Sequence, residues 1–166
     1  MKKLVILMLG AFLLITGVVT QGSTVRGTED KILEFDTMVG VSGPYLGAAG
    51  NPIRNLTGGG AAWTINQGRG ELQTDGDLEV TVQGLVVPAI GGTNPSATFR
   101  AVVSCQSIDG SGNANVVNVM TAPVPATLGG DADIEETLSL PSPCLAPIIF
   151  VGRGADPFRW FAVTGN

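Results

Sequence analysis

The sequence has no histidine. This absence excludes mechanisms that use an imidazole, including Ser-His-Asp triads, Cys-His dyads and His-ligated zinc or copper sites. Nucleotide-binding motifs are missing as well: there is no Walker A sequence, and the Gly-Arg-Gly at residues 68–70 lacks the third glycine of a dinucleotide loop. Residues 40–44 (GVSGP) resemble a nucleophile elbow, but Pro44 replaces its closing glycine and no histidine can activate Ser42. Carboxylates remain as candidates for acid–base chemistry.

Basic residues are also scarce. The chain has 9 lysines and arginines against 14 aspartates and glutamates, which gives a net charge of −5. Lys31 is the only lysine after Lys2 and Lys3. Nucleic acids and anionic lipids are bound by clustered lysines and arginines, so neither is an expected partner. An acidic, glycine-rich surface suits an uncharged or weakly cationic partner, such as a glycan or another protein.

The chain begins with positive charge followed by an apolar run. Lys2 and Lys3 precede the apolar residues 4–15, after which small and polar residues follow. This order is typical of a secretory signal peptide. The sequence therefore predicts a signal peptide over residues 1–22 and a protein that is secreted or held at the cell surface.

The end of this segment is less sharply defined than its start. Small residues favour cleavage after Gly22, and a cut after Thr20 is an alternative. An uncleaved membrane anchor is a second alternative, although residues 4–19 are shorter than the roughly 20 residues that a spanning helix needs. The remaining residues, 23–166, have a length typical of a single domain. Any contact with a membrane is expected only through the first segment, if it stays uncleaved.

The chain has two cysteines, Cys105 and Cys144. In an exported protein an even pair favours a structural disulfide. A redox pair usually lies close in sequence, as in Cys-X-X-Cys, and two inert core thiols are the other alternative. We expect the disulfide, which closes a loop of about 40 residues and stabilises the fold by roughly 4 kcal/mol.

Short segments alternate between apolar and polar residues with a period of two. Leu78, Val80 and Val82 fall on one face of such a segment, for example, and charged or polar residues fall on the other. The predicted strands are residues 31–41, 61–66, 70–74, 77–82, 98–107, 115–121, 134–140, 145–151 and 158–164. Eight or nine strands with frequent turns predict an all-β fold, an antiparallel β-sandwich, with a barrel as the alternative.

Turn residues separate these segments. We expect tight connections at residues 67–70 and at Asp75-Gly76, and a hairpin tip at residues 109–113, because glycine, aspartate and asparagine favour turns. Residues 40–62 are rich in glycine and predict a long loop, either laid over one end of the sandwich or acting as a flexible connector. Long ordered loops are often functional.

Two runs of carboxylates each alternate onto one face of a predicted strand. They are Asp75, Asp77 and Glu79, and Asp131, Asp133 and Glu135. Neighbours two residues apart on a strand face lie about 7 Å apart, which is compatible with the paired carboxyl groups of a glycoside hydrolase. Each run lies opposite an apolar face, however, and this pattern favours a solvated strand surface.

The hairpin tip weakly resembles a calcium loop. Asp109, Ser111, Asn113 and Asn115 recur at every second position, but Met120 stands where the bidentate glutamate belongs. A hairpin tip explains the pattern better, and we expect no metal or other cofactor.

Aromatic residues suggest where a ligand would bind. Trp63, Trp160 and Tyr45 form the predicted ligand surface, because exported sandwiches that bind sugars present flat rings. Packing in the core is the alternative for each ring.

Several stretches of the chain carry a resemblance. Residues 51–54 (NPIR), 97–105 (ATFRAVVSC), 143–144 (PC) and 160–165 (WFAVTG) resemble small exported bacterial all-β proteins with one cysteine pair and no assigned activity. The resemblance extends from about Leu33 onward and implies export and a cysteine pair, but no catalytic residue. A general likeness to immunoglobulin-like sandwiches rests on the strand number and the cysteine pair, and the tryptophan expected between the cysteines is missing.

These observations favour a non-enzymatic secreted or surface-associated protein that acts by binding or as a structural component. One alternative is a carboxylate-dependent polysaccharide hydrolase. Another is a self-associating coat or matrix component that would use exposed strand edges.

Overall fold

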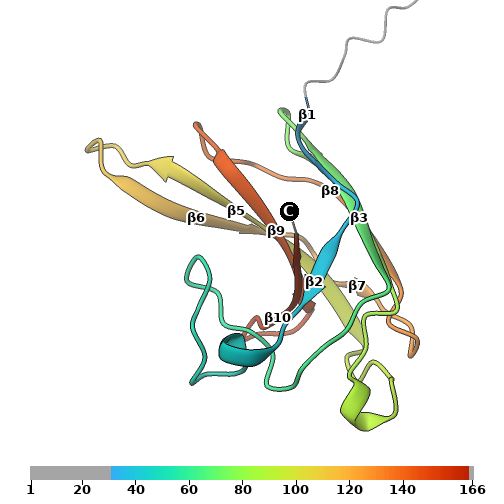
Figure 1. The fold of residues 1–166 in the computed structure, drawn as a ribbon. Helices are drawn as coiled ribbons and strands as arrows, with labels where there is room; N and C mark the ends of the chain where they lie inside the picture. Colours follow the sequence, from blue (N-terminus) through green and yellow to red (C-terminus); the bar gives the residue numbers. More distant parts are fainter. Residues whose placement is uncertain (1–30, 165–166) are drawn as a thin grey trace, which may run out of the picture.

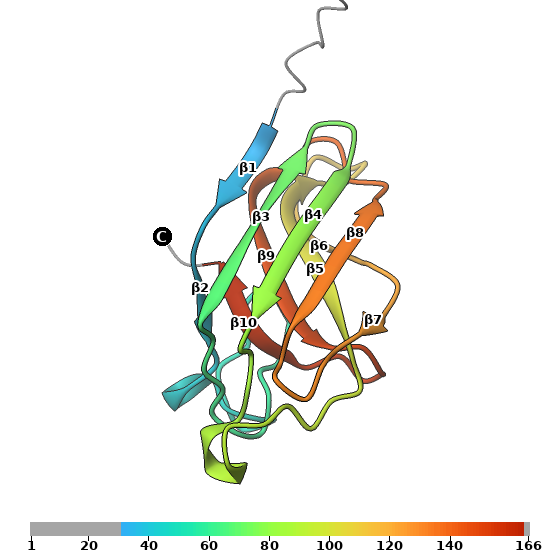
Figure 2. The ribbon, with the colours of Figure 1, turned by 90° about the vertical axis from the view of Figure 1, so that its right-hand side faces the viewer.

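The computed structural model describes residues 31–164, which fold into two facing antiparallel sheets (Figures 1 and 2). The strands are β1 (Lys31–Phe35), β2 (Met38–Gly40), β3 (Gln67–Gln73), β4 (Asp77–Gln83), β5 (Thr98–Ile108), β6 (Ala114–Met120), β7 (Val124–Pro125), β8 (Ala132–Thr137), β9 (Leu145–Arg153) and β10 (Trp160–Thr164). The predicted all-β sandwich is confirmed. The predicted signal peptide lies outside the described residues.

The two sheets have different sizes. One has four strands in the order β1-β3-β4-β8 and faces the viewer in Figure 2. The other follows the order β2-β10-β9-β5-β6, with β7 beside the first residues of β5. Two 3-10 helices, η1 (Gly43–Tyr45) and η2 (Pro88–Ile90), lie in the connections.

Two of the predicted strands are wrong in detail. Residues 31–41 form two strands, because the chain leaves the four-stranded sheet after β1 and enters the six-stranded sheet as β2. Residues 61–66 form no strand. The Trp63 amide donates to Val41 and Thr64 pairs with Val86, so this backbone bonds to separate partners rather than to one ladder.

Glycines mark one predicted turn correctly and one wrongly. Gly76 has a φ of 97° in the turn between β3 and β4, and a side chain there would collide with the backbone of Leu138, so this turn is confirmed. The turn predicted at residues 67–70 is wrong, because this segment is the first half of β3. A side chain at Gly70 would collide with Phe35 and with the backbone of Glu79, so this glycine permits close packing inside the sheet.

The core lies between the two sheets. The four-stranded sheet contributes Leu72, Leu78 and Ile134, which are fully or almost fully buried. On the opposite side Trp63 stacks on Phe161 with ring centroids 3.8 Å apart. Because side chains alternate between the two faces of a strand, the polar residues between these buried ones point outward from the four-stranded sheet.

Residues 41–62 form an ordered loop that lies against β10, on the side away from the four-stranded sheet (Figure 1). The amide of Gly59 donates to the Trp160 carbonyl, and the amide of Trp160 donates to the Thr57 carbonyl. Farther along, Asn118 on β6 donates to the Arg54 carbonyl. The predicted long loop is therefore confirmed and is ordered, but this covering loop lies on the outer side of the six-stranded sheet and not over one end of the sandwich.

Candidate functional site

The structure does not bring the predicted aromatic ligand surface together. Trp63 is 5% exposed and Trp160 is 2% exposed, so neither ring is presented to a ligand and this prediction is wrong for both. The Trp160 indole N–H donates to the Leu56 carbonyl at 3.1 Å, which fastens the covering loop. Tyr45 alone is partly accessible, at 39% exposure, and its ring lies beside that of Trp160.

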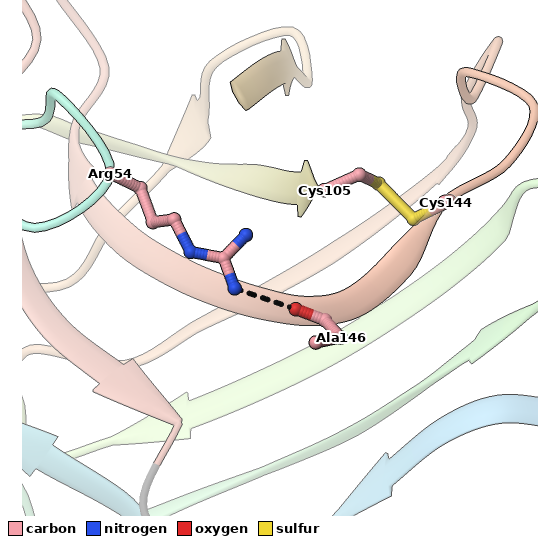
Figure 3. Close-up of a disulfide and its surroundings, with 4 residues drawn as sticks. All are labelled: Arg54, Cys105, Cys144 and Ala146. Atoms are coloured by element: carbon pink, nitrogen blue, oxygen red, sulfur yellow. Dashed lines mark hydrogen bonds between the residues drawn. A yellow bond between two sulfur atoms is a disulfide. The ribbon is translucent and has the colours of Figure 1, made fainter. Parts of the chain in front are cut away.

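The cysteine pair forms a disulfide, as predicted (Figure 3). It joins β5 to the residue just before β9, with the Cα atoms of Cys105 and Cys144 4.9 Å apart. Cys105 is fully buried. Nearby, an Arg54 guanidinium nitrogen donates to the Ala146 carbonyl at 2.9 Å. The disulfide and this arginine together fix the start of β9.

The carboxylates of the four-stranded sheet form a single row. In the strand register Glu34 lies opposite Glu71, Glu71 opposite Glu79, and Glu79 opposite Glu135. Residues directly opposite each other on antiparallel strands have Cβ atoms about 4.5–5.5 Å apart. We call these four residues the glutamate row. It crosses β1, β3, β4 and β8 on the outward face of the sheet.

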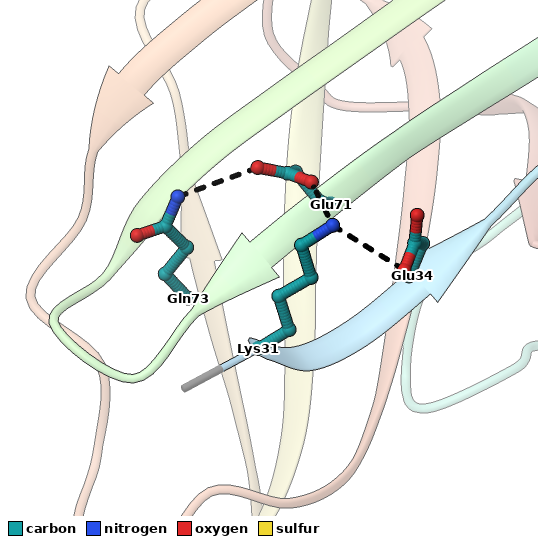
Figure 4. A network of polar contacts seen from close by, with 4 residues as sticks. All are labelled: Lys31, Glu34, Glu71 and Gln73. Atoms are coloured by element: carbon teal, nitrogen blue, oxygen red, sulfur yellow. Dashed lines mark hydrogen bonds and ion pairs between the residues drawn. The ribbon is translucent and has the colours of Figure 1, made fainter. Parts of the chain in front are cut away.

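One end of the glutamate row carries a counter-charge (Figure 4). The Lys31 ammonium lies 2.7 Å from Glu71 and 3.3 Å from Glu34, and Gln73 donates to Glu71 at 3.3 Å. The hydrogen bond from Lys31 lowers the pKa of Glu71, and the same bond raises the pKa of Lys31. Glu79 and Glu135 form no ion pair within residues 31–164. These two carboxylates, on β4 and β8, therefore have no direct counter-ion within the described residues.

Two aspartates beside the glutamate row make the outward face more acidic, and a groove lies on the same face. Asp133 lies opposite Thr81 one row away, and Asp77 accepts a hydrogen bond from the Thr137 hydroxyl on the other side. A shallow groove runs along the face over β1, β3 and β4, and its lining includes Glu34, Glu71 and Glu79. Arg69 is the one basic residue among those lining it.

The two acidic runs were visible in the sequence, but their meeting was not. Strand alternation placed Glu79 and Glu135 outward, each on its own strand. Glu34 and Glu71 were missed, although each also alternates with apolar neighbours. Only the register of the strands aligns the four, and register between distant strands has no local signal in the sequence.

The hairpin tip uses its aspartate internally. Asp109 accepts hydrogen bonds from the backbone amides of Ser111 and Asn113 at 2.9 Å each, and from the Asn113 side chain. The two amide bonds lower the pKa of Asp109. The predicted hairpin tip is confirmed. Within the described range no three Asp, Glu, His or Cys side chains are grouped so that they could hold a metal ion.

The fold and the site define a disulfide-closed β-sandwich with one strongly acidic sheet face. Comparison with protein-family models, curated protein sequences and solved structures returned no match. The resemblance to exported bacterial proteins therefore stays a prediction. Over residues 31–164 no helix has the length and apolar character needed to cross a membrane.

Proposed function

We propose that this is an exported, non-enzymatic binding protein whose glutamate row holds a positively charged segment of another protein. The glutamate row carries the proposal. Like charges directly opposite each other on antiparallel strands destabilise a sheet. The strands nevertheless align Glu71, Glu79 and Glu135, and within residues 31–164 only the first of them is paired with a cation. A cationic partner would remove this repulsion on binding.

The dimensions of the row suit an extended basic segment. Neighbouring strands lie about 4.8 Å apart, so four strands place the outermost glutamates about 14 Å from each other. Alternate side chains of an extended peptide point to the same side, about 7 Å apart. Two or three lysines or arginines at alternate positions would therefore reach carboxylates along the row.

Two observations favour a protein partner over a glycan and support export. The rings of Trp63 and Trp160 are buried, so the glutamate row has no tryptophan platform on which a sugar would stack. The Cys105–Cys144 disulfide is of the kind that persists in oxidising compartments outside the cytosol.

The test is binding of a fluorescent oligolysine peptide, measured by anisotropy at low and at physiological ionic strength. We expect Glu79→Gln to weaken binding several-fold, and added salt to weaken it further. Asp109→Asn is the matched control, since it removes one charge from the hairpin tip of the other sheet and keeps an acceptor oxygen. No binding, or equal weakening by the two variants, would contradict the proposal.

A second candidate function is a carboxylate-dependent hydrolase. The observation that favours it is the direct opposition of Glu79 and Glu135, because retaining glycosidases hold two carboxyl groups about 5–5.5 Å apart. The test is release of reducing ends from a polysaccharide panel. Turnover that is lost in Glu135→Gln supports the hydrolase. No turnover by the unmodified protein counts against it.

A further inference from the structure

Strand β6 is an edge of the six-stranded sheet. Ala114–Met120 pair with β5 on one side, and no other strand of the described chain pairs with β6 on its remaining side. Figure 1 shows β5 and β6 as a long hairpin at one end of the sheet. An edge of this kind presents unpaired backbone donors and acceptors.

The hydrogen bonds at both ends of the hairpin show which groups point outward. The Thr121 amide donates to the Ala101 carbonyl at 3.0 Å, and the Asp109 amide donates to the Asn113 carbonyl at 2.9 Å. Hydrogen-bonded and non-hydrogen-bonded pairs alternate along an antiparallel ladder. The residues of β6 that direct N–H and C=O groups to the outer side are therefore Ala114, Val116, Asn118 and Met120.

The sequence of β6 lacks the charged residues and prolines that usually protect an edge strand against pairing. β6 has the sequence ANVVNVM, with no charge, no proline and no glycine. By contrast, β8 at an edge of the other sheet carries Asp133, Glu135 and Glu136, and β2 at the far edge has only three residues. The β5–β6 hairpin also exposes apolar side chains: Met120 at the end of β6 is 39% exposed, and Ile108 at the end of β5 is 51% exposed.

The strand is also held in place within its own chain. The Asn118 side chain donates to the Arg54 carbonyl at 2.9 Å, which ties the middle of β6 to the covering loop. The Asp109 carboxylate holds the hairpin tip. A partner strand that adds to β6 would meet an edge that is already ordered, and this lowers the entropy cost of association.

We infer that a second copy of this chain pairs with β6 antiparallel about a two-fold axis, which joins the six-stranded sheets of the two copies into one. With the axis at Val117, Val116 lies opposite Asn118 of the second copy and Ala114 lies opposite its Met120. This contact brings no like charges together. The glutamate row lies on the other sheet, so the acidic faces of the two copies are not brought face to face.

Sedimentation equilibrium of the purified protein over a wide concentration range tests the inference. We expect a reversible dimer that is at least tenfold weaker in Val116→Pro. Proline removes an amide that points away from β5, so the hairpin ladder is retained. Val116→Thr is the matched control and should dimerise like the unmodified chain. A monomer at every concentration, or an unchanged dimer in Val116→Pro, would overturn the inference.

Hydrogen exchange provides an independent measurement that does not depend on how proline is tolerated. At high protein concentration the amides of Val116 and Asn118 should become protected, while the Val117 amide, bonded to β5, should be protected at all concentrations. Val116→Lys, which keeps the amide, should weaken the dimer by placing like charges near the axis. Glu79→Gln should leave the dimer unchanged, which separates this result from the proposed function. Exchange at Val116 that is independent of concentration would refute the edge pairing.

Discussion

At the scale of the residue, the charged groups of the four-stranded sheet differ sharply in their surroundings. Glu71 has both a lysine and a glutamine as hydrogen-bond donors, whereas Glu79 beside it has no ion-pair partner within residues 31–164. Both residues are glutamates on adjacent strands at the same level of the sheet. Their different chemistry follows from the position of Lys31, which reaches the row only from the β1 side.

This contrast predicts the acid titration of Glu71. Its carboxyl group should titrate below the ordinary value of 4.5, because the hydrogen bond from Lys31 favours the ionised form. Since the folded-state pKa is lowered, the contribution to stability is present above the ordinary value and is lost as pH falls through the lowered one. Carbon-detected NMR titration measures the midpoint directly.

Lys31→Ala is the matched variant for this titration. It should move the Glu71 midpoint upward. The variant should be less stable than the unmodified protein above the ordinary pKa of 4.5, and this difference should disappear as the pH falls. A Glu71 midpoint that is the same in both proteins would show that Lys31 does not hold the carboxylate in solution.

At the scale of the element, the loop over residues 41–62 is the least regular part of the described chain, yet it is fixed at several points. The Trp160 indole holds Leu56, backbone bonds hold Thr57 and Gly59, and Arg54 reaches Ala146 on β9. Arg54 has a φ of 51°, a left-handed conformation that is unfavourable for an arginine. The contacts of its guanidinium and carbonyl groups offset that strain.

Trp160→Phe tests how the loop is held. The variant keeps a ring in the site but removes the indole donor of the Leu56 carbonyl and leaves only the Ile53 amide bonded to it, which should cost about 1 kcal/mol and increase hydrogen exchange over residues 56–59. Trp63→Phe is the matched control, because it removes the same atoms from a buried tryptophan with no such bond to the loop. Equal exchange over residues 56–59 in the two variants would show that the indole bond does not fasten the loop.

At the scale of the whole molecule, the disulfide joins the connection between β8 and β9, which passes from one sheet to the other, to β5 in the core. The Cys105–Cys144 disulfide links β5 to the start of β9, after the chain has passed through β8 of the opposite sheet. The sequence separation is 39 residues. Closing a loop of this length restricts the unfolded chain more than it changes the folded one.

Replacing both cysteines by alanine should therefore lower the free energy of unfolding by about 4 kcal/mol, as measured by chemical denaturation. Alanine suits the fully buried site of Cys105 better than serine does. The unmodified protein unfolded with reductant should show a loss of the same size. An unchanged denaturation midpoint would mean that the disulfide is not formed or does not stabilise the fold.

The sequence itself determined the elements whose cause is local. Alternation of apolar and polar residues predicted β4 and β5, and Asp75-Gly76 predicted the tight turn between β3 and β4. The cysteine pair in a chain with a predicted signal peptide indicated a disulfide. Each depends on neighbours in the chain or on a single covalent bond, so each leaves a signal within a few residues.

The tertiary structure decided which residues meet. It buried Trp63 and Trp160, because a covering loop and an opposing sheet closed over them. It also placed Gly70 within a strand, where Phe35 and the backbone of Glu79 leave no room for a side chain. It also aligned Glu79 with Glu135, two residues from strands far apart in sequence. Register and burial are set by packing across the sandwich, because the free energy of a long-range contact depends on all the elements that bring its partners together.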